Sequence, residues 1–448
     1  MPTTRLETDY LVLGAGAMSL AFVDVILAED PAAHVVMVDR REGPGGHWND
    51  AYPFVRLHQP AAFYGLNSTP LGQGGADLAS GPEVVAYYKR AVDHFVATGR
   101  LEFLPMCEYR GDGRVVSTMD EDRVLEITVR RRVVDGTYMT VEVPFLRSPP
   151  YAVDPDASVV PPNGLPQVDR PRKRYVIVGA GKTAIDAIVF LLDAGVAPTR
   201  LQWIVPNEAW LWNRATVQPG AVLATFTAMV ESVADAANVD DVFLRLERQD
   251  IVFRVDTGTL PSKWRCATID ERELHALRRV DDVVRLGRVE RIRAGDVQLE
   301  AGTVDAVEDS LFVDCTANGL ARYEPRPLFS AGRITLQSTL MCQQTFSAAL
   351  IAHLELSDIG DDERNRLCTA VPHPEAHHDL PSSLVTSVQN MINLHAHMPL
   401  WLRRSRLNPI HHEPLPRYLL GTTKLALLQR RAVAATAGMQ PGVRTTTA

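Results

Sequence analysis

The sequence predicts an α/β protein with two Rossmann-like dinucleotide-binding domains and a helical C-terminal extension. Two glycine turns, at 14–16 and 179–181, each follow a short apolar strand and precede an apolar helix. Another short strand follows each helix, so each turn belongs to a βαβ unit. Residues 356–448 contain no such turn, and their pattern is typical of helices separated by proline-rich loops.

The first βαβ unit covers residues 9–39. Its first glycine permits a tight turn, its second lets the backbone approach a pyrophosphate, and the small residue at 19 keeps the helix close to the strand. The first helical amides present the positive end of the helix to phosphates, and the carboxylate after the second strand is placed to accept ribose hydroxyls. The residues expected to bind a dinucleotide here are Gly14, Gly16, Ala17, Met18, Ser19, Asp39 and Arg40.

A Gly-Gly-x-Trp motif begins six residues after the ribose carboxylate, at 45–48. The acidic residue, its spacing and this motif resemble the flavin-containing monooxygenases, class B flavoproteins with two dinucleotide domains. In that family the stretch binds FAD. The resemblance implies a first domain for FAD, with further contacts from Gly45, Gly46, His47 and Trp48. The alternative is that the glycines form only a turn and the tryptophan belongs to the core.

The overall composition argues against several other classes of protein. The chain has 448 residues, 46% of them hydrophobic, and a net charge of −8 without long like-charge blocks, which argues against nucleic-acid binding. No apolar run reaches the roughly 18 residues of a membrane span, and no apolar signal segment precedes the first strand, so a cytoplasmic location is expected. The five cysteines include no Cys-x-x-Cys; most are expected to be buried apolar side chains, and a distant pair stays open.

An irregular segment rich in Tyr, Phe and Pro, residues 52–70, follows the first unit. In the flavin-containing monooxygenases, a segment of similar length passes the reactive edge of the flavin and carries an Asn-Ser pair, where this chain has His58 and Gln59. Oxygen chemistry at a flavin needs a hydrogen-bond donor in an otherwise dry pocket. His58 can donate and can exchange a proton near neutral pH. We expect His58 and Gln59 to be catalytic; the alternative is that they are satisfied loop residues.

The second βαβ unit covers residues 174–205. Its turn is no Walker P-loop, because Val176 stands where that motif needs a glycine. The second strand ends in Pro-Asn-Glu, without a clean acidic residue to reject a 2′-phosphate, and nearby basic side chains could neutralise one, which favours NADPH over NADH. The residues expected to bind the nicotinamide cofactor are Gly179, Gly181, Lys182, Thr183, Asn207 and Arg214.

The order of these signals predicts an FAD domain made discontinuous by an inserted NAD(P) domain. A proline-rich stretch at 148–172 marks a boundary, and a strand at 311–313 resembles the place where such flavoproteins return to the FAD domain. In related flavoproteins the helix that corresponds to 346–356 points its N-terminus at the flavin pyrimidine, which makes Gln343 and Gln344 candidate contacts. The predicted boundaries are 1–165 and 305–355 for the FAD domain, 170–304 for the NAD(P) domain and 356–448 for the extension.

Two regions carry weaker signals. Alternating apolar residues between 101 and 143, with Asp-Gly at 135–136, predict a small antiparallel sheet with a hairpin turn. Seven of the thirteen histidines lie in the extension, at 373, 377, 378, 395, 397, 411 and 412. With few acids nearby, they are interpreted as loop and surface residues, and no metal site is expected.

The leading functional hypothesis is an FAD-dependent, NAD(P)H-using monooxygenase that oxidises a small organic substrate with O2 through a flavin peroxide. The sequence near Phe145 lacks the fingerprint of Phe-x-Gly followed by His of the flavin-containing monooxygenases, so a divergent member is expected. This mismatch and the His58-Gln59 pair keep open a flavin-dependent reductase or dehydrogenase that passes electrons to an organic acceptor. A non-catalytic nucleotide-binding flavoprotein is the third hypothesis. The substrate and the oligomeric state are left open.

Overall fold

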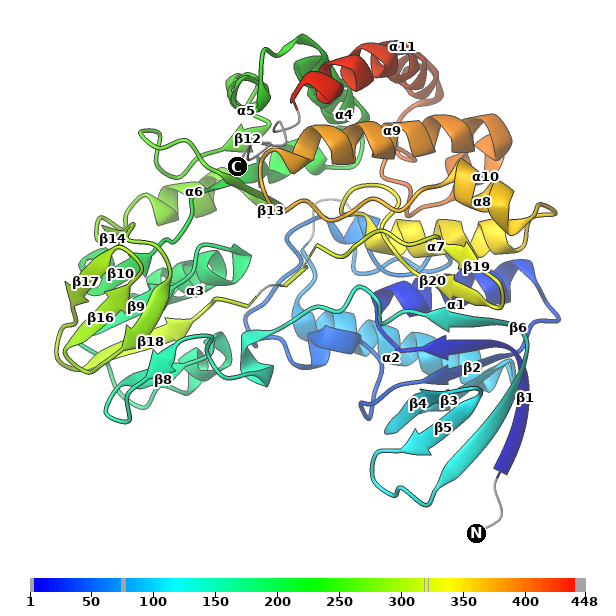
Figure 1. Cartoon of the computed structure of the whole chain (residues 1–448), viewed down its shortest axis with the longest axis horizontal. Helices are drawn as coiled ribbons and strands as arrows, with labels where there is room; N and C mark the ends of the chain where they lie inside the picture. Colours follow the sequence, from blue (N-terminus) through cyan, green and yellow to red (C-terminus); the bar gives the residue numbers. More distant parts are fainter. Residues whose placement is uncertain (1–3, 74–77, 318, 321, 440–448) are drawn as a thin grey trace, which may run out of the picture.

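The computed structural model describes residues 4–73, 78–317, 319–320 and 322–439. Two mainly parallel sheets lie on opposite sides of the molecule, with helices of the extension above the N-terminal one (Figure 1). This confirms the predicted α/β class with two nucleotide-binding domains and a helical extension. Residues 440–448 of that extension lie outside the described residues. Among the described residues, no helix has the length and apolar character that a membrane span needs.

The first sheet is built on the first βαβ unit. Its main path runs, in spatial order, through β19 (Phe329–Ser330), β20 (Arg333–Thr335), β6 (Val124–Asp135), β1 (Thr4–Leu13), β2 (Val35–Val38) and β3 (Leu101–Leu104). The helices associated with it are α1 (Ala17–Glu29), α2 (Gly81–Ala97) and α7 (Gln344–Glu355). Ten of the 13 residues of α1 are buried, because the helix lies between this sheet and α7.

Residues 101–143 differ from the prediction. A small antiparallel sheet does form, from β4 (Cys107–Gly111), β5 (Arg114–Ser117) and the first part of β6. The predicted hairpin turn at 135–136 is wrong, because β6 continues to Asp135 as a parallel partner of β1 and β20. Along one edge of β6 the partner changes from β5 to β20. The side-chain pattern therefore changes along the strand, and the sequence pattern alone suggests two separate strands.

The second sheet is built on the second βαβ unit and is entirely parallel. Its spatial order is β14 (Val283–Val284), β10 (Leu201–Ile204), β9 (Arg174–Val178), β18 (Ser310–Asp314) and β8 (Ser158–Val160). One face packs on α3 (Lys182–Asp193) and α6 (Glu271–Leu277). The other packs on a small sheet of β17 (Gly302–Asp305), β16 (Asp296–Leu299), β15 (Val289–Ile292) and β7 (Ala152–Val153). Because β8 and β18 belong to this sheet, the second domain extends beyond the predicted 170–304 at both ends.

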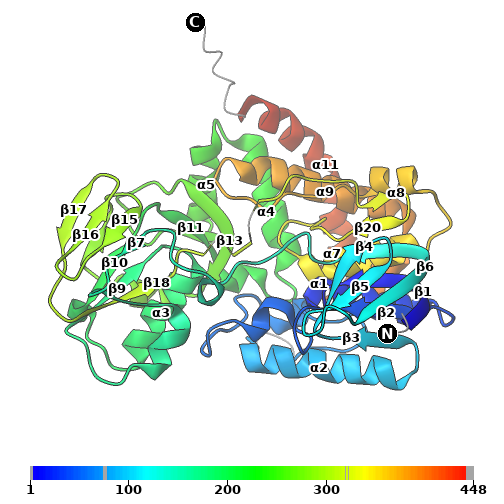
Figure 2. The ribbon, with the colours of Figure 1, turned by 60° about the horizontal axis from the view of Figure 1, so that its bottom comes forward.

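A third group of elements lies between the two sheets (Figure 1, Figure 2). It consists of β11 (Ala209–Asn213), α4 (Val222–Asp235), α5 (Val239–Arg248), β12 (Val252–Phe253) and β13 (Lys263–Ile269). The extension contributes α8 (Asp361–Leu367), α9 (Asp379–His397), α10 (Pro399–Arg404) and α11 (Leu415–Met439). Apolar side chains of the third group, the extension and the first domain form one continuous core. By packing, residues 209–269 therefore contact the first domain as well as the second, although they follow the second glycine turn in the chain.

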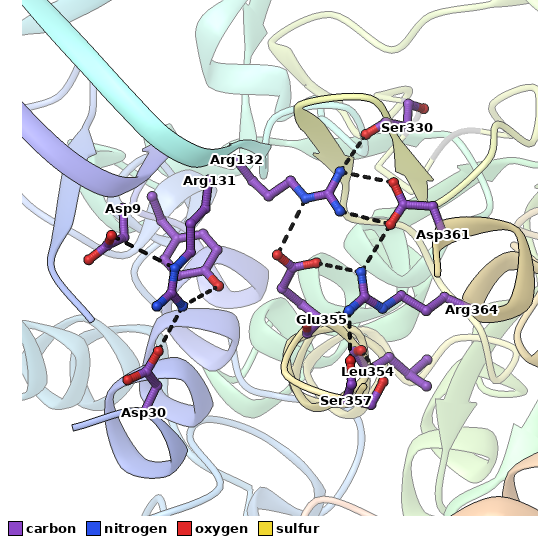
Figure 3. A network of polar contacts seen from close by, with 11 residues as sticks. Asp9, Asp30, Arg131, Arg132, Ser330, Leu354, Glu355, Ser357, Asp361 and Arg364 are labelled. Atoms are coloured by element: carbon purple, nitrogen blue, oxygen red, sulfur yellow. Dashed lines mark hydrogen bonds and ion pairs between the residues drawn. The ribbon is translucent and has the colours of Figure 1, made fainter. Parts of the chain in front are cut away.

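A cluster of buried ion pairs fixes the C-terminal end of α7 (Figure 3). Arg132 on β6 donates to Glu355 at 3.3 Å and to both oxygens of Asp361 at 2.9 and 2.8 Å. Arg364 donates to the same two carboxylates at 3.1 and 3.0 Å. Burial raises the pKa of Glu355, whereas the two guanidinium groups oppose that effect. Because removal of one partner would leave an unpaired buried charge, the cluster holds α7 in place and so fixes where its N-terminus lies.

The extension also reaches into the first domain through Arg406. Its guanidinium donates to the backbone carbonyls of Leu66, Ala62, Tyr64 and Thr69, at 2.8, 2.9, 2.9 and 3.2 Å. Burial lowers the pKa of Arg406, and the carbonyl oxygens replace the water that the cation has lost. The loop at 60–70 is therefore held by a residue 340 positions after Leu66 in the chain.

The cysteines fall into two classes. Cys107, Cys315 and Cys368 are buried free thiols, as predicted. Cys266 and Cys342, which lie 76 residues apart, form a disulfide. This is a distant pair of the kind that the sequence left open.

Candidate functional site

The first glycine turn and the Gly-Gly turn pack directly against each other. A Cβ at Gly46 would lie 3.1 Å from the Cα of Gly16, and the Gly45 amide donates to the Ala15 carbonyl at 2.8 Å. Gly45 and Gly46 have φ values of 121° and 59°, which favour glycine. The two turns form a cradle with walls of backbone, so that a ligand can approach the first amides of α1 closely.

The start of α1 is suited to an anion. The helix begins at Ala17 with Gly16 as its N-cap, and its first turn, which includes Met18 and Ser19, contains no acidic residue. Its free amides therefore face the cradle without a competing carboxylate. Ser19 is fully buried and donates to the Leu13 carbonyl at 3.5 Å, which keeps the helix close to β1. A pyrophosphate site needs these features, and that role of the turn stays a prediction.

Asp39 lies directly after β2, beside the first glycine turn. Its Oδ2 accepts from the Ala15 amide at 2.6 Å, and its Oδ1 accepts from the Arg41 amide at 2.7 Å. The residue is 6% exposed, and each carboxylate oxygen keeps a further lone pair for a hydroxyl donor. Arg40, by contrast, is exposed. The geometry is compatible with ribose binding by Asp39 and gives no anchored position to the Arg40 side chain.

His47 and Trp48 close the Gly-Gly turn. The indole Nε1 of Trp48 donates to the Tyr64 hydroxyl at 2.7 Å, and the two rings meet edge to face with 6.0 Å between centroids. Trp48 is half-buried, so it both packs on the core and keeps some surface for a ligand. Burial lowers the pKa of His47 to about 4, and this imidazole is neutral at physiological pH.

The structure brings Gln59 and Gln343 together across 284 residues of sequence. Gln343 Nε2 donates to Gln59 Oε1 at 3.1 Å, and Gln343 is the N-cap of α7, which begins at Gln344. The remaining amide oxygen, Gln343 Oε1, is buried and has no hydrogen-bond partner among the described residues. An unsatisfied buried acceptor costs about 1–3 kcal/mol. This atom therefore fits the N–H of a flavin pyrimidine, which would supply the missing donor.

His58 is bonded to the third group of elements. Its Nδ1 lies 2.9 Å from the Thr268 hydroxyl, and that hydroxyl donates to the His58 carbonyl. Burial lowers the pKa of His58 to about 3, and the positive charges of Lys182 and Arg214 add to the effect. The predicted proton exchange near neutral pH is therefore wrong for this environment. The imidazole stays neutral and can take part only through hydrogen bonds.

Lys182 and Arg214, the predicted partners of a 2′-phosphate, are both held in ion pairs. Lys182 pairs with Asp186 and Glu273 at 2.5 and 2.8 Å. Arg214 pairs with Glu273 and Asp270 at 2.5 and 2.7 Å. Glu273 bridges the two cations, whose side chains are only 19% and 7% exposed. A phosphate would have to displace a carboxylate, so neither cation is free for the predicted role.

The second glycine turn is more open than the first. Gly179 has a φ of 118°, and a Cβ there would lie 2.8 Å from the Cys315 carbonyl oxygen. At Gly181, no described heavy atom lies within 4 Å of the position that a Cβ would take. Thr183 follows in the first turn of α3, and Asn207 is half-buried in the loop after β10. The amides at the start of α3 are therefore accessible to a ligand.

The segment that carries His58 and Gln59 also touches the second nucleotide unit. The Tyr52 hydroxyl donates to Asp186 on α3 at 2.6 Å. Phe54 stacks on Phe190 of the same helix with 4.2 Å between ring centroids. Because this segment follows the Gly-Gly turn in the chain, it connects the two nucleotide-binding turns and places the predicted catalytic pair between them.

Sequence reasoning missed Thr268, Glu273 and Asp186. Asp270 and Glu273 form a capping box at the start of α6, and this spacing does predict a helix start. The four-residue spacing of Lys182 and Asp186 on α3 was the other readable signal. The contacts of Glu273 with cations from other elements leave no local trace in the sequence.

The histidines of the extension were predicted to be loop and surface residues, but two of them are not on the surface. His373 is 3% exposed, and its Nδ1 lies 3.6 Å from Cys342 Sγ. His395 is half-buried and bonded through its ring nitrogens to the Met391 carbonyl and the Tyr418 hydroxyl, each at 2.6 Å. Both rings lie in packed contacts because the helices and loops of the extension cover the first domain.

An apolar cavity of about 390 Å³ lies between α4, α9 and α11. Its polar neighbours are already satisfied; Asn408, for example, donates to the Leu402 carbonyl at 2.8 Å. Leu340, three residues before the N-cap of α7, forms part of the wall and brings the cavity toward the candidate site. Other apolar side chains of the wall are Val222, Phe226, Val388, Met391 and Leu425.

These features define a flavoprotein fold with two dinucleotide-binding domains, and solved structures share it. Cyclohexanone monooxygenase bound to ε-caprolactone is 14% identical, with a TM-score of 0.54 over 97% of this chain and 99% of that one. Polycyclic ketone monooxygenase from Thermothelomyces thermophila is 14% identical, with a TM-score of 0.52 over 98% and 89%. Steroid monooxygenase bound to NADP is 14% identical, with a TM-score of 0.51 over 97% and 98%. The chain has the fold of the flavin monooxygenases.

Sequence comparison gives the family. The uncharacterized protein Rv2000 of Mycobacterium tuberculosis is 43% identical over 439 residues, which cover 92% of this chain and 81% of that protein. A shorter match, 24% identical over 197 residues, covers 42% of this chain and 40% of the FAD-containing monooxygenase EthA of Mycolicibacterium smegmatis. No protein-family model matches the chain. The chain belongs to the family of the mycobacterial protein Rv2000.

Proposed function

We propose that the protein is an FAD-dependent monooxygenase that uses NADPH or NADH. The observation that carries this proposal is the contact of Gln59 with Gln343, beside His58 and its bond to Thr268. These contacts put a neutral polar pair at the N-terminus of α7 and tie it to the third group of elements. A polar pair in a buried environment is what oxygen chemistry at a flavin requires of its surroundings.

Contacts within the first domain join the glycine cradle to the start of α7. Trp48 of the Gly-Gly turn bonds to Tyr64, and the neighbouring Phe63 carbonyl accepts from Thr345 Oγ1 on α7 at 3.3 Å. A dinucleotide bound in the cradle would therefore extend along residues 60–64 toward Gln343. This path supports one continuous FAD site.

The residues present suit three parts of FAD. Asp39 would accept the ribose hydroxyls, the amides at 16–19 would bind the pyrophosphate, and Gln343 Oε1 would accept from the pyrimidine. When bound, FAD takes a hydride from the nicotinamide and reacts with O2. The chain itself would contribute position, exclusion of water and hydrogen bonds from His58 and Gln59.

The second glycine turn would bind the nicotinamide cofactor through the amides at the start of α3. Val205 directly follows β10, in the place that Asp39 takes after β2, so a 2′-phosphate would meet no carboxylate there. This supports NADPH rather than NADH. Because Lys182 and Arg214 are paired with Glu273, the charge of the phosphate would be met by other groups.

The apolar cavity between α4, α9 and α11 is the proposed substrate site. Its volume of about 390 Å³ suits a small organic molecule, and its apolar wall favours one with little charge. Leu340 connects this wall with the N-terminus of α7. Use of O2 as co-substrate, like a cytoplasmic location, stays a prediction.

The proposal is tested by two mixing steps. The purified protein is reduced with NADPH without oxygen and then mixed with oxygenated buffer, while flavin absorbance is recorded. A transient absorbance band before return of the oxidised spectrum is the expected result. Direct reoxidation without such a band, also with small apolar ketones present, would favour the reductase, and no reduction at all would favour a nucleotide-binding protein.

A further inference from the structure

The Cys266–Cys342 disulfide joins the two elements that hold the candidate catalytic pair. Cys266 lies in β13, two residues before Thr268, which bonds to the candidate histidine. Cys342 directly precedes Gln343, which bonds to the candidate glutamine. One covalent bond therefore links the two sides of the site, whichever reaction that site carries out.

The backbone around both cysteines is held in an unusual conformation. Cys266 has a φ of 55°, and Met341, the residue before Cys342, has a φ of 39°. Such values are costly for residues other than glycine and persist only where surrounding contacts impose them. Here the Met341 amide donates to Ser387 Oγ on α9 at 2.9 Å. The chain is therefore constrained on both sides of the sulfur pair.

An irregularity in β13 aims the Cys266 side chain. Trp210 of β11 pairs with Trp264, but the next pair joins Trp212 to Thr268, so β13 advances by four residues where β11 advances by two. A bulge of this kind leaves residues unpaired and turns their side chains out of the regular alternation. Cys266 lies in the middle of the irregular stretch and points toward Cys342 instead of following the sheet.

His373 completes the group. Its Nδ1 lies 3.6 Å from Cys342 Sγ, and the imidazole is also bonded to the Arg265 backbone. Burial lowers its pKa to about 4, so the ring is neutral. A disulfide sulfur has no proton to offer Nδ1, whereas the Cys342 thiol has one. The pocket around the sulfurs is thus equipped for the reduced state as well as for the oxidised one.

We propose that Cys266, Cys342 and His373 form a thiol–disulfide exchange site for low-molecular-weight thiols. Cys342 is half-buried whereas Cys266 is 4% exposed, so a thiolate attacks the sulfur of Cys342 and expels the thiolate of Cys266. A second thiolate then attacks the small-molecule sulfur of the mixed disulfide and releases Cys342. Two small thiols become one small disulfide, and their two protons pass to the two cysteines.

Exchange at this site changes the coupling between two parts of the molecule. In the oxidised state β13 and the start of α7 are covalently joined, so Thr268 and Gln343 keep a fixed separation. In the reduced state only packing and hydrogen bonds hold them. The thiol state of the solution therefore sets how rigidly the candidate catalytic pair is held.

The test is a thiol titration of the full chain as purified. The protein is equilibrated with mixtures of reduced and oxidised glutathione, quenched with acid, alkylated, and read cysteine by cysteine by peptide mass spectrometry. Cys266 and Cys342 should convert together and reversibly, while Cys107, Cys315 and Cys368 stay reduced throughout. A pair that is reduced in every mixture, or that reacts only after unfolding in urea, would overturn the proposal.

Thermal melting supplies an independent readout. Reduction should lower the melting temperature of the natural chain by about 5 °C, because a long closed loop is released. The shift should vanish in Cys342→Ser and persist in Cys368→Ser, the matched control in which a buried free thiol is changed. Equal shifts in the two variants would contradict the assignment, and the titration of the natural chain decides the matter if either variant fails to fold.

His373 and zinc give two further outcomes. His373→Leu should move the titration toward the disulfide by roughly fivefold, because the Cys342 thiol loses its acceptor. An unchanged midpoint would remove His373 from the site. The two Sγ atoms and a ring nitrogen of His373 lie within 4.8 Å of one another, so the reduced protein is also mixed with zinc and gel-filtered. One retained zinc ion per chain would overturn the proposed exchange site and indicate a metal site instead.

Discussion

The two nucleotide-binding turns share a motif and differ in how closely they are enclosed. In the first, Gly16 lies against Gly46, and the Ala15 carbonyl is bonded to the Gly45 amide. In the second, no described heavy atom lies within 4 Å of the Cβ position at Gly181. A second layer of backbone over the first turn suits a cofactor that stays bound, and an open second turn suits a cofactor that exchanges at every turnover.

The charged side chains beside the two turns are also held in different ways. After the first, Asp39 is buried and tied by two backbone amides. Beside the second, Lys182 and Glu273 belong to an ion-pair network that joins α3, α6 and the segment after β11. The same βαβ unit is thus fixed by backbone contacts in one case and by side-chain charges in the other. Changes at the two turns should therefore have different consequences.

The largest effect is expected from Gly16→Leu. A leucine side chain would fill the cradle beside Gly46 and block the approach of a pyrophosphate. The variant should purify without FAD, as judged by the ratio of flavin to protein absorbance. Retention of a full yellow colour would show that the first turn does not hold FAD. The contrast between a turn for a bound cofactor and a turn for an exchanging one would then fail.

Glu273→Gln should have the next largest effect. It leaves Lys182 and Arg214 without the charge that bridges them, which is expected to lower the free energy of unfolding by about 3 kcal/mol. Urea unfolding measures this, and Glu271→Gln, an exposed change on the same helix, is the control. FAD content should stay normal while reduction by NADPH slows. If FAD content and reduction by NADPH were lost together, the ion-pair network would support the whole site and not the second turn alone.

Gly181→Ala should have a smaller and more selective effect. The added methyl group meets no described atom and the φ of −85° suits alanine, so stability should be unchanged. NADPH binding should nevertheless weaken by roughly tenfold, equivalent to about 1.4 kcal/mol, because the methyl group stands where the pyrophosphate would approach. The Michaelis constant for NADPH measures this. If that constant is unchanged, the second turn does not bind the cofactor through Gly181.

Mild acidification should affect the first turn by the smallest amount. Burial holds the pKa of His47 at about 4, below its ordinary value of 6.5. Once the turn opens, His47 takes up a proton at pH below 6.5, so the closed turn loses stability as pH falls from 6.5 to about 4. Release of FAD, seen as a rise in flavin fluorescence, should increase over this window. His47→Gln should flatten the rise, and an unchanged profile would place the acid sensitivity elsewhere.

The glycine turns could be predicted from the sequence because each depends only on residues that are close together in the chain. A strand, a turn that needs glycine and a helix follow one another within about 30 residues in a βαβ unit. The positions of Gly14, Asp39 and Gly181 relative to their strands and helices follow from that local order. The roles of Lys182 and Arg214 did not, because Glu273, which pairs with both, lies 91 residues after Lys182.

The domain boundaries and the polar site could be recognised only from the three-dimensional structure. Residues 209–269 follow the second glycine turn, yet their tryptophans, Phe226 and Phe243 enter the core of the first domain and the extension. The contact of Gln59 with Gln343 and the disulfide of Cys266 with Cys342 likewise join segments that no local pattern relates. Only the resemblance to a known family directed attention to residues 58–59 and 343–344 before their contacts were seen.

Arg406 has a consequence for the order in which the chain acquires its cofactor. The loop at 60–70 is fixed by the guanidinium of a residue 340 positions after Leu66. At a synthesis rate of about 5–20 residues per second, that residue leaves the ribosome roughly 20 to 70 seconds after the loop. The glycine cradle can form early on the nascent chain, but the wall between the cradle and α7 gains this anchor only afterwards. Completion of the proposed FAD site is thus a late event in the synthesis of this protein.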